Sequence, residues 1–93
     1  MTNILLAAHM VASWYNSPFH GMTCATRDFP VGTHLRITEI HNRISVVVVV
    51  KERGPALWVL RRDQRVKIDL SKEAFERLDG IELGHCDVTV IKL

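Results

Sequence analysis

The sequence predicts a mainly β fold, arranged as a small barrel or sandwich. Short runs rich in β-branched and aromatic residues follow one another, and turn residues such as Gly, Pro, Asn and Asp separate them. Two of these runs, at 33–40 and 65–70, alternate apolar and polar residues, as half-buried strands do. A chain of 93 residues has room for one folding unit, so we expect a single domain over 1–93.

The first strand is expected at 11–15, where strand-forming residues run up to an Asn-Ser-Pro stop. The runs 33–40 and 44–51 flank a His-Asn-Arg turn and are expected to pair as a hairpin. The second run contains five consecutive valines, which disfavour a helix and lack alternation. We therefore expect both faces of that strand to be covered.

In the hairpin strand 33–40, Leu35, Ile37 and Glu39 fall on one side. The next strand is terminated by a Gly-Pro pair at 54–55, since proline donates no ladder hydrogen bond.

The run 65–70 places Val66, Ile68 and Leu70 on one face, with Asp69 on the other.

A short helix is expected at 72–78, because Ser71 is a good N-cap and Gly80 a good stop. The closing strand is expected at 86–93. The segment 56–64 is ambiguous.

Composition excludes some classes of function. The net charge of +2 is too small to favour nucleic acid as a partner, and no run is long enough for a membrane span, so we expect a soluble protein. Residues 1–11 lack the basic start of a signal peptide and are interpreted as part of the domain. Cys24 and Cys86 have no His partners at zinc-site spacing, so we expect no metal and no cofactor; a disulfide and two buried free thiols both stay open.

Four segments in chain order resemble the rare lipoprotein A family: 12–21 (ASWYNSPFHG), 29–38 (FPVGTHLRIT), 48–55 (VVVKERGP) and 67–78 (KIDLSKEAFERL). The resemblance covers the chain from about 11 to 93. It implies a six-stranded double-psi β-barrel with one or two short helices, similar more distantly to expansins and barwin-like proteins. The family includes lytic transglycosylases that cut peptidoglycan strands lacking stem peptides.

The resemblance also implies a set of site residues. Asp69, in Ile-Asp-Leu-Ser, corresponds to a catalytic or glycan-contacting Asp, and Glu52 replaces the Asp of the family's Asp-Arg-Gly-Pro. Thr26 stands where the family has a His. A lytic transglycosylase needs one carboxyl group as acid and then base, so the pKa of Asp69 must be raised, and repulsion by Glu52 is one expected cause.

Tyr15, Ser13, His20, Thr26 and Arg53 are the expected substrate-binding residues. The less specific alternatives stay open: Tyr15 or its neighbour Trp14 packs in the core, and His20 lies on the surface.

Two further alternatives concern the carboxylates. Asp69 could accept backbone hydrogen bonds at the helix start, and Glu52 could pair with Arg53. Between Arg-Gly-Pro and Ile-Asp-Leu-Ser the family has a shorter connection than this chain. The added residues include Trp58, Arg61 and Arg62, which could bind glycan or a partner protein.

The residues and the resemblance together suggest three alternative functions. The first is lytic transglycosylase-like cleavage of glycan strands, with Asp69 as the acid/base and Glu52 assisting. The second is non-catalytic glycan binding of the expansin type, suggested by Thr26. The third is a structural or assembly module among virion or envelope proteins. The location stays unknown, and a bacteriophage particle or the host periplasm are the places considered.

Overall fold

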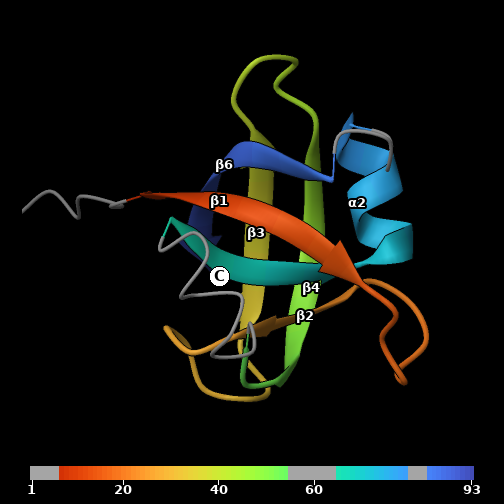
Figure 1. Cartoon of the computed structure of the whole chain (residues 1–93). Coiled ribbons are helices and arrows are strands. Elements are labelled where there is room, and N and C mark those ends of the chain that lie inside the picture. Colours follow the sequence, from red (N-terminus) through yellow and green to blue (C-terminus); the bar gives the residue numbers. More distant parts are fainter. Residues whose placement is uncertain (1–6, 55–64, 80–83) are drawn as a thin grey trace, which may run out of the picture.

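The structure is a computed structural model that describes residues 7–54, 65–79 and 84–93. Six strands close into one barrel, and a single described helix packs beside it (Figure 1). In chain order the elements are β1 (Ala8–Tyr15), β2 (Thr23–Thr26), β3 (His34–Glu39), β4 (Ser45–Glu52), β5 (Val66–Ser71), α2 (Lys72–Asp79) and β6 (His85–Lys92). The mainly β prediction is confirmed. No helix among the described residues is long and apolar enough to cross a membrane.

The strand order around the barrel is β1-β5-β2-β4-β3-β6, with β6 pairing back to β1. The pairs β1–β5 and β2–β4 are parallel, and the other pairs are antiparallel. The expected hairpin is present as β3–β4. The sequence pattern did not mark β2, because a run of four small or polar residues is too short to show an alternation.

The predicted alternation is confirmed in β3 and β5, and the valine run of β4 alternates in burial as well. In β3, Leu35, Ile37 and Glu39 are all buried, as expected. In β4, Val46, Val48 and Val50 are buried. Val47, however, is 45% exposed. The expectation that both faces of this strand are covered is therefore wrong, because a barrel strand turns one face inward and leaves much of the other to solvent.

The helix forms where it was predicted. The hydroxyl of Ser71 accepts a hydrogen bond from the Ala74 N–H at 3.3 Å, as an N-cap does. Buried side chains of α2 are Ala74, Phe75 and Leu78. The side-chain amide of Asn42 donates to the Leu78 carbonyl at 2.7 Å, which satisfies one of the free carbonyls of the last turn. The predicted stop at Gly80 lies outside the described residues.

Glu39 is a buried carboxylate with its own local partners. Its two carboxylate oxygens accept the backbone N–H groups of His41 and Asn42 at 2.9 and 2.8 Å. Burial opposes the charge, but these two bonds and the nearby His41 lower the pKa of Glu39 below its ordinary value. The residue therefore holds the β3–β4 turn as an ionised group.

The two cysteines are buried and unpaired, so the free-thiol alternative is the one observed. Burial raises the pKa of each thiol to about 12, and nearby carboxylates add to the effect at Cys86. Thiols held in this way are poor nucleophiles, and we assign them to the core.

The alternation of β4 can be tested with a matched pair of substitutions. Val48→Ala removes buried methyl groups and should lower the free energy of unfolding by about 2 kcal/mol, whereas Val47→Ala should cost about 1 kcal/mol or less. Urea denaturation of both variants measures the difference. Equal losses would contradict the assigned inner and outer faces.

Candidate active site

One row of paired residues crosses four neighbouring strands. Asp69 of β5 pairs with Ser13 of β1 on one side and with Ala25 of β2 on the other, and Ala25 pairs in turn with Glu52 of β4. Asp69 lies between the buried Ile68 and Leu70, so its side chain leaves the opposite, outer face of the barrel. Paired residues share a face, and Ser13 and Glu52 therefore belong to the same surface.

A register shift makes this arrangement possible on β4. Cys24 pairs with Val50, but the next residue, Ala25, pairs with Glu52, so Lys51 is left over. Without that shift Glu52 would follow Val48 and Val50 toward the core, because alternate residues of a strand share a face. One strand lies between β5 and β4, so the backbones of Asp69 and Glu52 are about 10 Å apart.

Asp69 is half-buried and receives a hydrogen bond from the Ser13 hydroxyl. Burial raises the pKa of Asp69 above its ordinary value, and the Ser13 bond opposes this shift because it favours the charged carboxylate. The cause differs from the expected repulsion by Glu52. Nor does Asp69 cap α2, since Ser71 provides the cap.

Glu52 is bound by Tyr15, which lies on β1 two residues after Ser13 and pairs with Ser71. The Tyr15 hydroxyl donates to the Glu52 carboxylate at 2.7 Å and so joins β1 to β4 across the two strands between them. Among the described ion pairs Glu52 has none with Arg53, which is exposed.

Burial raises the pKa of Tyr15 to about 12; Ser17 opposes the shift and Glu52 adds to it. The tyrosine therefore stays a hydrogen-bond donor over the ordinary range of pH.

The two adjacent aromatic residues have different positions. Trp14 packs against the barrel core, and the Lys72 ammonium lies 5.9 Å from its ring centroid. The Tyr15 hydroxyl instead reaches the Glu52 carboxylate.

Three other candidates do not join the row. Thr26 is fully buried, and its hydroxyl donates to the Lys67 carbonyl at 3.0 Å and accepts from the Asp28 N–H at 3.2 Å. It offers no surface to a glycan, so its assignment as a substrate-binding residue is corrected to a structural one. His20 is exposed in the loop between β1 and β2, and Arg53 lies just past the end of β4.

Trp58, Arg61 and Arg62 lie outside the described residues.

No sequence pattern marks Ala25, although this residue lies between the two carboxylates in the row. It is 3% exposed, and its methyl group takes up little of the surface between them. The signal that identifies Ala25 is the pairing of β2 with β5, which no local sequence pattern contains.

The closed barrel of six strands, with parallel β1–β5 and β2–β4 pairs, defines the fold class of the chain. Residues 7–90 match the double-psi β-barrel family model described as "Lytic transglycolase", and the chain belongs to that family. The resemblance to rare lipoprotein A is thereby confirmed at the level of the family.

Curated relatives carry the name endolytic peptidoglycan transglycosylase RlpA. The one from Campylobacter jejuni is 34% identical over 91 residues, covering 84% of this chain and 31% of its own length. The one from Pseudomonas aeruginosa is 36% identical over 92 residues, covering 85% of this chain and 25% of its own. The chain thus spans about a quarter to a third of these relatives.

Among solved structures, the expansin of Clavibacter michiganensis aligns with a TM-score of 0.74 at 19% identity. The alignment covers 95% of this chain and 50% of that one. A mutant of the same expansin, solved in complex with cellohexaose, aligns with a TM-score of 0.74 at 18% identity. At this identity the likeness shows the fold.

The environment of Tyr15 can be measured directly, because it is the one tyrosine of the sequence. Titration of tyrosinate absorbance should give a pKa of about 12 in the folded protein. Glu52→Gln should lower that pKa toward 10 without reaching it, since burial is the larger cause. Asp28→Asn, at an exposed carboxylate, is the control and should change nothing. A wild-type pKa near 10 in the folded state would contradict the described contact.

Proposed function

We propose that the chain is a peptidoglycan-directed domain that cleaves glycan strands in the manner of a lytic transglycosylase, with Asp69 as the acid and then the base. The observation that carries this proposal is the half-buried Asp69 of raised pKa, which lies in one row with Ser13 and Glu52. The names of the curated relatives support the same substrate and the same reaction.

The reaction needs one proton donor in the right place. Protonated Asp69 donates to the glycosidic oxygen as the bond from that oxygen to C1 of the muramoyl sugar breaks. The C6 hydroxyl of that sugar then forms the new bond to C1 and returns its proton to Asp69. The product is a 1,6-anhydro-muramoyl end. Because the attacking group belongs to the substrate, no water has to be held in position.

Glu52 has an assisting role in this scheme. Positive charge develops at the sugar in the transition state of glycosidic cleavage, and a carboxylate on the same face stabilises it. Tyr15 positions that carboxylate by its hydrogen bond. A spacing of about 10 Å between the two backbones leaves room for a sugar between the side chains.

A second candidate function is glycan binding without cleavage. The observation that favours it is Thr26, which stands where the family has a His and is fully buried with both its hydroxyl bonds made to the backbone. The expansin barrel, solved with a bound cellohexaose in one case, supports this alternative. The hypothesis of a structural or assembly module stays a prediction.

The decisive variant is Asp69→Asn, which keeps the size of the side chain and removes the acid. It should reduce formation of 1,6-anhydro-muramoyl ends from peptide-free glycan strands by about 100- to 10,000-fold, as loss of an acid/base group does. Mass spectrometry of the products measures this. Asp28→Asn, at an exposed carboxylate outside the row, is the matched control and should retain activity. If the wild type forms no such ends but is retained by the strands, the binding alternative holds instead.

The Ser13 bond offers a test through pH. Ser13→Ala removes the interaction that lowers the pKa of Asp69, so that pKa should rise further. The protonated acid then persists to higher pH, and the alkaline limb of the rate profile set by free-enzyme Asp69 should move upward. Measurement of kcat/KM from pH 3 to 8 detects the shift. A limb that stays in place, or moves downward, would be inconsistent with Asp69 as the acid.

A further inference from the structure

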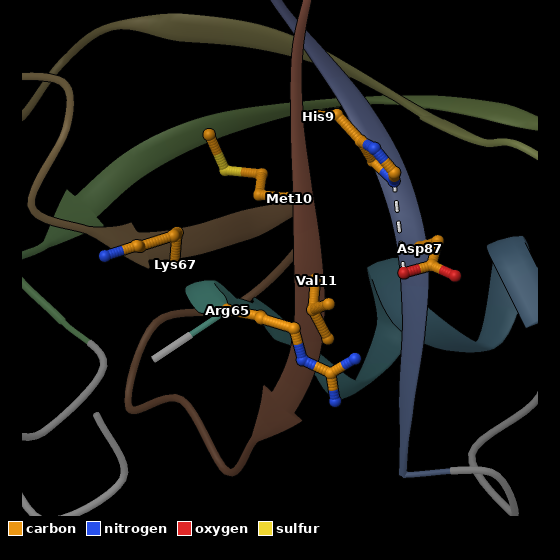
Figure 2. A pocket seen from close by; sticks show the side chains of 6 residues that line it. All are labelled: His9, Met10, Val11, Arg65, Lys67 and Asp87. Carbon is orange, nitrogen blue, oxygen red and sulfur yellow. Dashed lines mark ion pairs between the residues drawn. The ribbon is translucent and has the colours of Figure 1, made fainter. Parts of the chain in front are cut away.

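A pocket next to the row gathers basic side chains that the proposed reaction does not use. Its volume is about 320 Å³. It is lined by His9, Met10 and Val11 of β1, Arg65 just before β5, Lys67 of β5 and Asp87 of β6 (Figure 2).

Lys67 connects this pocket with Asp69. The two residues are two positions apart on β5, so their side chains leave the same face, about 7 Å apart along the strand. Lys67 is exposed and Asp69 half-buried, whereas Ile68 between them is fully buried. The pocket therefore continues the outer surface on which Asp69 and Ser13 lie.

The backbone fixes the position of Lys67. Val11 pairs with Val66 and Ala12 pairs with Ile68, so the residue between them on β5 has no partner on β1. A register shift of this kind bends a strand and redirects a side chain, and it is common beside active sites. The buried hydroxyl of Thr26 holds the Lys67 carbonyl at 3.0 Å on the other side.

The charges around the pocket are unevenly placed. Arg65 and Lys67 are cationic, and His9 is charged when protonated. Among the described lining residues only Asp87 is acidic, and its carboxylate oxygens lie 4.0 Å from the His9 imidazole and 3.9 Å from that of His41. Figure 2 shows the Lys67 side chain on one side of β1, and the Arg65 guanidinium together with Asp87 on the other. The cation nearest Asp69 along β5 is therefore the Lys67 ammonium.

We propose that Lys67 binds a carboxylate carried by the glycan strand beside the bond held at Asp69. This rests on the proposed function. Every second sugar of a peptidoglycan strand is muramic acid, whose lactyl group ends in a free carboxylate where no peptide is attached. The Lys67 ammonium pairs with it as a point charge. The pocket thus selects a muramoyl sugar over a neutral one.

The experiment combines two ligands with matched protein variants. The ligands are peptide-free glycan strands and the same strands after conversion of their carboxylates to neutral amides. The protein is Asp69→Asn, so that no strand is cut, with or without Lys67→Gln. Lys92→Gln, at an exposed lysine of β6, is the control. Binding is measured by calorimetry, and circular dichroism checks that each variant is folded.

Lys67→Gln should weaken binding of the charged strands by about three- to tenfold and leave binding of the amidated strands unchanged. Lys92→Gln should change neither. Equal loss with both ligands, or no loss with either, would overturn the carboxylate site. If wild type cuts strands and Lys67→Gln binds both ligands normally, only this site fails. If wild type neither cuts nor binds any strand, the proposed function fails, and the site with it.

Discussion

The arrangement of this site depends on the insertion of β2 between β5 and β4. That strand is antiparallel to β5 and parallel to β4, so a single small residue, Ala25, is the partner of both Asp69 and Glu52. The register of the barrel therefore determines the spacing of the two carboxylates. A slip by one residue on β5 would turn Asp69 into the core and bring Ile68 to the surface, because side chains alternate along a strand. The same pairing places Lys67 and the basic pocket next to Asp69.

Burial has opposite outcomes at two carboxyl groups of this barrel. Glu39 is the more deeply buried, yet its pKa is lowered because two backbone N–H groups bind its oxygens. Asp69 receives one hydroxyl, and burial prevails, so its pKa is raised. The number and kind of donors decide between a structural anion and a group able to carry a proton. Glu39 stays ionised and holds a turn, whereas Asp69 can gain and lose a proton.

The features that the sequence predicted correctly are local ones. The alternation of β3 and β5, the hairpin and the Ser71 cap all follow from residues within a few positions of one another. The outward direction of Asp69 belongs to this group.

The features that it could not predict depend on pairing between distant segments. The valine run has one residue type at five positions, so no pattern could show that Val47 is exposed and Val48 buried. Register shifts leave Lys51 without a paired residue on β2 and Lys67 without one on β1, and they are visible only once β2 and β1 are placed. Thr26 was taken for a site residue because the family motif marks its position, but the depth of β2 removes it from the surface.

The proposed function requires the barrel to hold Asp69 as a carboxyl group able to donate a proton to a glycan. Titration of its side-chain carboxyl carbon by NMR tests this most directly, with the urea-unfolded chain as the reference. We expect a midpoint above the ordinary value of 3.8 in the folded protein and a return to that value on unfolding. A folded-state midpoint at or below 3.8 would show that the Ser13 bond outweighs burial, and would contradict the assignment of Asp69 as the acid.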